Sequence, residues 1–70
     1  MEESFDDRYP NIAWWTQSGR GWIEFGRDEY RRSMIRVMDI GGMLWEGEET
    51  YDRAAEALEE ADRFIEQLRR

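Results

Sequence analysis

The sequence contains no cysteine and no histidine, and arginine supplies all ten of its basic residues. The lack of cysteine excludes disulfide bonds and thiolate sites. The lack of histidine removes the commonest metal ligand and the side chain that titrates near neutral pH. Because lysine is also absent, no Schiff base can form, and the serines have no histidine or lysine to activate them as nucleophiles. We therefore predict no catalytic residue, no metal and no cofactor, and do not expect an enzyme.

Long apolar runs are missing as well. No stretch approaches the ~20 consecutive apolar residues of a membrane-spanning helix. The acidic first residues have no apolar stretch behind them, unlike a secretory signal. These absences predict a cytoplasmic protein with no membrane partner. The formal net charge of −7 also disfavours nucleic acid as a partner, because an excess of carboxylates repels phosphate groups.

Aromatic residues, by contrast, are abundant: four tryptophans, three tyrosines and three phenylalanines among 70 residues. Each ring can bury about 150–250 Å², so the chain can build a core although 39% of its residues are charged. A chain of this length has room for one core. We predict a single domain over residues 9–70, preceded by a flexible acidic N-terminus over residues 1–8.

The first ordered segment is predicted at residues 10–17. Ile12 and Trp15 have the spacing of one helix face, and proline stands at the first position, where a helix tolerates it. A strand in which Ile12, Trp14 and Thr16 share a face is also compatible with this pattern. We favour the short helix.

Three strands are predicted in the middle of the chain. Residues 21–26 are rich in β-formers and bracketed by glycines, and residues 32–40 form a second apolar run. Residues 27–31 read as the connection between them. Residues 39–42, Asp-Ile-Gly-Gly, suit a tight hairpin, and residues 43–46 follow as a short third strand. The pattern predicts an antiparallel meander.

The last segment has the clearest periodicity. Its apolar residues recur at helical spacing and form one stripe: Ala54, Ala57, Leu58, Ala61, Phe64, Ile65 and Leu68. Asp52 is predicted to cap its start. The fold class is therefore α+β: a short N-terminal helix, a three-stranded antiparallel meander and a C-terminal amphipathic helix packed on the sheet.

Alternation along the strands assigns side chains to the two faces of this sheet. One face is predicted to carry Ile23, Phe25, Ile35, Val37 and Leu44. The opposite face is predicted to carry Trp22, Met34, Met38 and Trp45, interspersed with Glu24 and Arg36. One helix covers only one face, so the other must be covered by the N-terminal segment, a second copy of the chain or a partner.

Three motifs carry a resemblance to known proteins: Tyr9-Pro10-Asn11-Ile12, Gly21-Trp22-Ile23-Glu24-Phe25-Gly26 and Trp45-Glu46-Gly47. Over residues 9–65 the sequence resembles a group of small uncharacterised bacterial proteins, many of them cyanobacterial. The sequence departs from that group at Arg53, where a serine or threonine helix cap would be expected. These proteins have no assigned activity, so the resemblance implies a fold and adds no function.

Two charged clusters invite functional interpretations. The acidic cluster Glu46, Glu48, Glu49 and Asp52 could offer oxygen ligands to Mg²⁺ or Ca²⁺, but it lacks the spacing of a calcium loop. We interpret it as solvated charge at a strand–helix junction. The arginines at 31, 32 and 36 could grip single-stranded nucleic acid beside aromatic rings, but they are equally expected to pair with acidic residues on neighbouring strands.

The adjacent pair Trp14-Trp15 points to a binding function. On a helix the two rings would lie about 100° apart, so one can enter the core while the other stays partly outside, and exposed tryptophan is enriched at binding hot spots. We predict a non-enzymatic protein–protein interaction domain, a homodimer or an accessory subunit. The predicted partner-binding residues are Trp14, Trp22, Met34, Met38 and Trp45. The alternative is an acidic inhibitor that mimics nucleic acid and blocks a DNA- or RNA-binding protein.

Overall fold

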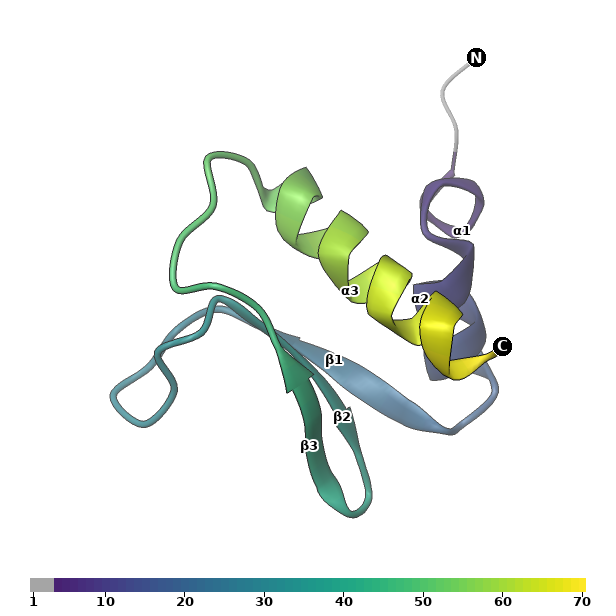
Figure 1. The fold of residues 1–70 in the computed structure, drawn as a ribbon, viewed down its shortest axis with the longest axis horizontal. Coiled ribbons are helices and arrows are strands. Elements are labelled where there is room, and N and C mark those ends of the chain that lie inside the picture. The colour runs from purple at the N-terminus through teal and green to yellow at the C-terminus, as the bar shows by residue number, and fades with distance from the viewer. Residues whose placement is uncertain (1–3) are drawn as a thin grey trace.

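Three helices and three strands follow one another along residues 4–70, the part of the chain that the computed structural model describes. In chain order they are α1 (Phe5–Arg8), α2 (Pro10–Gln17), β1 (Gly21–Phe25), β2 (Ile35–Asp39), β3 (Gly42–Glu46) and α3 (Ala54–Leu68). The strands form one antiparallel sheet in the order β1-β2-β3. Helix α3 lies along one side of the sheet, α2 packs beside α3, and α1 packs on α2 (Figure 1). The predicted α+β fold is confirmed.

The N-terminal part is more helical than predicted. Residues 10–17 form the favoured helix and not the alternative strand. Before it, α1 forms a single turn whose N-cap, Ser4, accepts a hydrogen bond from the backbone N–H of Asp7 at 3.2 Å. The serine cap and the acidic first turn favour this helical turn, whereas the flexibility predicted for this segment stays a prediction. The predicted flexibility of residues 1–3 lies outside the described residues.

The start of α2 is held by a side chain from α3. Asp62 accepts hydrogen bonds from the backbone N–H groups of Asn11 and Ile12, at 2.8 and 2.9 Å, and from the side-chain amide of Asn11 at 3.0 Å. Arg69 in turn donates to Asn11 Oδ1 at 2.9 Å. Since the first N–H groups of a helix have no partner within it, Asp62 serves as the cap and ties α2 to α3.

The core lies between α3 and the central strand. Ile35 and Val37 of β2 are fully buried against Ala57, Ala61 and Ile65 of α3. The two alanines let the helix approach the sheet closely, while the larger side chains fill the space between the layers. The C-terminal helix begins and ends at the first and last residues of its predicted stripe, Ala54 and Leu68, and the central members of that stripe form the face it buries.

A register shift in the β2–β3 hairpin corrects the predicted sheet faces. Asp39 pairs with Gly42 and Met38 with Met43, but Val37 pairs with Trp45, so Leu44 is left as an extra residue. Such a β-bulge exchanges the faces of all later residues relative to an unbroken ladder. The prediction that Leu44 faces the core and Trp45 the opposite side was therefore wrong. Trp45 lies on the core side, its ring stacked on Phe64 of α3 at 5.7 Å.

The strands end or begin one residue away from three of their predicted bounds, at Phe25, Asp39 and Gly42, and two further predictions differ from the structure. The second strand begins at Ile35 and not at residue 32, because the arginines before it belong to the connection from β1. Helix α3 has Arg53 as its N-cap, with extended backbone and no side-chain cap hydrogen bond. The prediction that Asp52 caps this helix was therefore wrong by one position.

Candidate functional site

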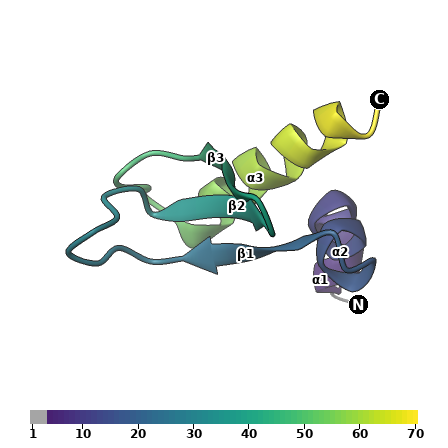
Figure 2. The same cartoon turned by 90° about the horizontal axis from the view of Figure 1, so that it is seen from below.

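One face of the sheet carries no helix within the described residues. Ile35 and Val37 point to α3, so the residues that alternate with them, Arg36 and Met38, point the opposite way. Figure 2, which views the molecule from the side of the β2–β3 hairpin, shows no helix in front of the three strands. We call this surface the open face. Its side chains are those of Trp22, Glu24, Arg36, Met38, Met43 and Glu46.

An apolar row crosses the open face. Met38 on the central strand is the register partner of Trp22 on β1 and of Met43 on β3. Trp22 is 45% exposed and Met43 is 41% exposed, whereas Met38 between them is buried. Leu44, the extra residue of the bulge, is exposed to a similar extent beside the row. Large apolar side chains that remain accessible on one face are typical of surfaces that bind a protein.

An ion pair between a buried arginine and a partly exposed glutamate occupies the other half of the open face. The guanidinium of Arg36, whose side chain is only 5% exposed, donates from Nε to Glu24 Oε1 at 3.1 Å. The indole N–H of Trp22 donates to the other oxygen of Glu24 at 3.2 Å. This hydrogen bond and the neighbouring guanidinium hold the pKa of Glu24 below its ordinary value of 4.5. Glu24 thus stays charged and compensates Arg36, which leaves the row of apolar side chains as the distinctive feature of the face.

The structure brings together two of the five residues predicted to bind a partner. Trp22 and Met38 are neighbours in the apolar row. Trp45 lies on the core side, as described above, and Met34 precedes β2, where its backbone N–H donates to the carbonyl of Glu48 at 2.7 Å. Trp14 belongs to α2 and packs beside Arg20 and Arg69, not on the open face.

The tryptophan pair divides between core and surface, as expected for a helix. Trp15 is buried, and its indole N–H donates to the carbonyl oxygen of Met38 at 3.1 Å. Trp14 is partly buried, and the guanidinium groups of Arg20 and Arg69 lie 4.6 and 4.3 Å from the centre of its ring. These cation–π contacts give Trp14 a structural role at the junction of α2 and α3.

Met43 and Leu44 are members of the exposed surface that the sequence did not identify. Met43 received no face assignment, and Leu44 was placed in the core because the hairpin was counted without a bulge. The signal that could have identified Met43 is its position directly after the turn at residues 39–42. In a hairpin closed by that turn, Met43 pairs with Met38, the residue directly before the turn. Nothing in the local pattern marks the bulge itself.

Titratable groups on and near the sheet predict how stability depends on pH. Hydrogen bonds from the backbone N–H groups of Tyr30 and Arg31 hold the pKa of Asp28 below its ordinary value of 3.8. The hydrogen bonds from Trp22 and Arg36 likewise hold the pKa of Glu24 below its ordinary value of 4.5. Burial raises the pKa of Tyr51 above its ordinary 10.0. The lowered carboxyl groups stabilise the fold above about pH 4.5, and this contribution is lost as pH falls through their folded pKa values. The raised tyrosine stabilises the fold below about pH 10 and loses its contribution as pH rises.

We therefore expect a flat stability plateau between about pH 5.5 and 7.5, apart from titration of the amino terminus. The measurement is the urea midpoint at a series of pH values from 3 to 11. The Tyr51→Phe variant should lose less stability than the wild type between about pH 10 and 11, because it has no hydroxyl to ionise at that position. A midpoint that changes steeply inside the plateau would contradict this assignment of the titrating groups.

Within residues 4–70, no group of three or more carboxylates gathers to hold a metal ion. None of the three helices in these residues combines the length and apolar character that crossing a membrane requires.

The chain matches no family model, and it matches neither the curated proteins nor the solved structures with which it was compared. The resemblance to small bacterial proteins thus stays a prediction based on its three motifs.

Proposed function

We propose that this protein is a non-enzymatic protein-binding domain that pairs with a second copy of itself through the open face. The observation that supports the proposal is the row formed by Trp22, Met38 and Met43 on a sheet face without a helix. Tryptophan is the residue most enriched at binding hot spots, alongside tyrosine and arginine. Methionine adapts its shape to an opposing surface and makes favourable sulfur–aromatic contacts.

The arrangement of the row favours a second copy as the occupant. Trp22 stands on one edge strand and Met43 on the other, with Met38 in the middle. In a face-to-face pair whose twofold axis runs parallel to β2, β1 of each copy lies over β3 of the other. Each Trp22 ring then meets Met43 of the second copy, and Met38, buried between them, lies beneath this contact near the axis. A twofold interface requires such self-complementarity.

The size of the face predicts a weak dimer. Strands of five residues span about 17 Å, and three of them cover about 14 Å in width. The area enclosed by this length and width is well below the ~800 Å² per partner of a standard stable interface. Two copies with a net charge of −7 each also repel one another, and salt screens this repulsion over about 8 Å at physiological strength. We therefore expect association that strengthens as salt increases.

Analytical ultracentrifugation over a concentration series tests the proposal. The mass should rise from 8.5 kDa towards about twice that value, and the rise should occur at lower protein concentration in 300 mM than in 50 mM salt. Met43→Glu should abolish the rise, because it introduces a charge that the interface would have to bury. Leu68→Glu is the matched control: Leu68 is 48% exposed on α3, away from the open face, and its substitution should leave dimerisation unchanged.

Melting temperatures close to that of the wild type are required of both variants before their masses are compared. A chain that stays monomeric at every concentration would overturn the self-association proposal. If such a monomer bound a basic protein tightly in 50 mM salt and released it in 200 mM salt, the acidic-mimic alternative would take its place.

A further inference from the structure

The connection between β1 and β2 is a positively charged region in an acidic protein. Residues 26–34, which we call the arginine loop, contain three arginines and two acidic residues, and therefore have a charge of +1, while the whole chain carries −7. The five charged residues are Arg27, Asp28, Glu29, Arg31 and Arg32. Its charge is opposite to that of the chain as a whole, which makes it the natural place for an anion.

Hydrogen bonds hold the arginine loop in a defined conformation. The buried guanidinium of Arg36 donates to the Gly26 carbonyl at 2.8 Å and to the Ser33 carbonyl at 2.6 Å, and so joins the two ends of the loop. At the tip, Asp28 Oδ1 accepts from the backbone N–H groups of Tyr30 and Arg31, both at 2.8 Å. A loop that is already ordered loses little entropy when it binds a ligand.

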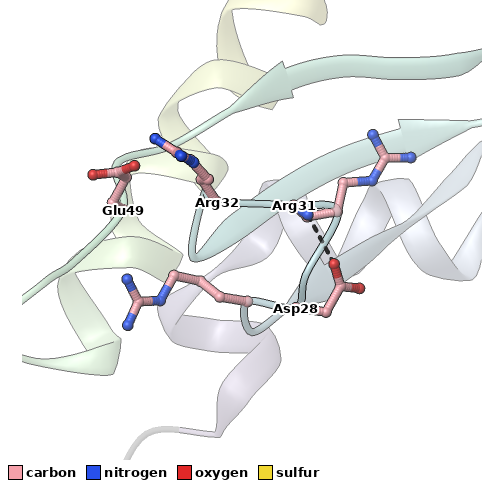
Figure 3. Close-up of a pocket in the computed structure, with 5 residues that line it drawn as sticks. Asp28, Arg31, Arg32 and Glu49 are labelled. Atoms are coloured by element: carbon pink, nitrogen blue, oxygen red, sulfur yellow. Dashed lines mark hydrogen bonds between the residues drawn. The ribbon is translucent and has the colours of Figure 1, made fainter.

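A shallow pocket of about 330 Å³ lies at this loop, lined by Arg27, Asp28, Arg31, Arg32 and Glu49. In Figure 3, Arg32 extends towards the segment that carries Glu49, and Arg31 lies on the side of Asp28. No ion pair within residues 4–70 involves the three exposed arginines. Asp28 is already engaged by the loop backbone. Glu49 is therefore the acidic group of the pocket that would compete with an incoming anion.

We propose that this pocket binds a compact, doubly charged oxyanion: a phosphoryl group, either free or carried by a small molecule or a side chain. The guanidinium group presents paired N–H donors that match phosphate oxygens, and it remains charged at every physiological pH. A compact anion within about 8 Å of the loop experiences mainly the local positive charge, because salt screens the acidic remainder of the protein. An extended polyanion would also lie against that acidic remainder and be repelled. The proposal is independent of the open face and of dimerisation.

A titration with inorganic phosphate, followed by two-dimensional NMR at constant ionic strength, tests the proposal. We expect saturable shifts of the backbone amides of residues 27–32 and of the arginine side-chain signals, with a Kd in the millimolar range. Arg32→Gln should weaken binding at least about fivefold, through the loss of a charge-assisted hydrogen bond. Glu49→Gln should strengthen it by about threefold, because the competing charge is removed. Arg63→Gln, an equal change of charge on an exposed residue of α3, should leave the Kd unchanged.

Two further titrations identify the source of the phosphoryl group. A short phosphoserine peptide that binds more tightly than inorganic phosphate would indicate a protein-borne group, and equal or weaker binding would indicate a free one. A single-stranded oligonucleotide that binds more tightly than either would overturn the compact-anion proposal. The absence of saturable shifts up to about 50 mM phosphate, or equal weakening by Arg32→Gln and Arg63→Gln, would also overturn it, since screened surface charge alone gives no site preference.

Discussion

The Gly21→Ala variant is expected to lose a large part of its folding stability. An added Cβ would overlap the carbonyl oxygen of Met38 and lie 2.6 Å from the indole nitrogen of Trp15. That carbonyl accepts the hydrogen bond of the buried indole, so relief of the clash would break this bond as well. Overpacking costs about 1–3 kcal/mol, and an unpaired buried donor costs about as much again. A domain of 70 residues has only ~4–10 kcal/mol in total.

Urea denaturation followed by tryptophan fluorescence measures this loss, for which we expect at least about 3 kcal/mol. Gly41→Ala is the matched control. Its added Cβ would lie 3.3 Å from a carboxylate oxygen of Asp39, at the end of a flexible side chain, so we expect a change within about 0.5 kcal/mol. Equal stability of the two alanine variants would contradict the close approach of α2 and β2 at Gly21.

Replacing Arg36 with methionine should produce the second large effect. The guanidinium compensates Glu24 and donates to the carbonyls of Gly26 and Ser33, so its loss leaves buried polar groups without donors. Each carbonyl that is left without its donor in this way typically costs about 1–3 kcal/mol. The variant should also release the arginine loop, because the same guanidinium joins the two ends of that loop.

Thermal and urea denaturation measure the loss for Arg36→Met against Arg63→Met, in which the same side-chain change is made on an exposed face of α3. The control should differ from the wild type by about 0.5 kcal/mol at most. Arg36→Lys should fall between the two, because it keeps the charge but not the fork of donors. If Arg36→Met were as stable as Arg63→Met, the role of Arg36 as the internal anchor of the open face would be wrong.

The elements that the sequence predicted well are those specified by local periodicity. The stripe from Ala54 to Leu68 predicted the bounds of α3, and its members Ala57, Ala61 and Ile65 form the face that the helix buries. The hairpin turn at Asp39–Gly42 was equally predictable, since glycine tolerates the backbone it requires: Gly42 has a φ of 126°. The pair Trp22 and Met38 was assigned to the exposed face for the same reason, because alternation along a regular strand needs no distant information.

The features that the sequence did not predict depend on contacts between distant residues or on irregular backbone. Asp62 caps α2 from 50 residues away, and no pattern within either helix indicates that pairing. Arg36 could be placed on the correct face, but its burial follows from the carbonyls that the arginine loop presents to it. The faces of Trp45 and Leu44 were predicted the wrong way round because a bulge depends on how two strands pair. The alternation of side chains within one strand does not reveal it.

The bulge also has a consequence for how the gene can change. Leu44 has no register partner, while the residues on both sides of it are paired. Loss of its codon would leave Met43 opposite Met38 and Trp45 opposite Val37, so neither side chain would move to the other face. Loss of a codon within a regularly paired stretch would instead exchange the core and the open face for every residue beyond it. The hairpin thus contains a position at which evolution can shorten the chain and keep both surfaces.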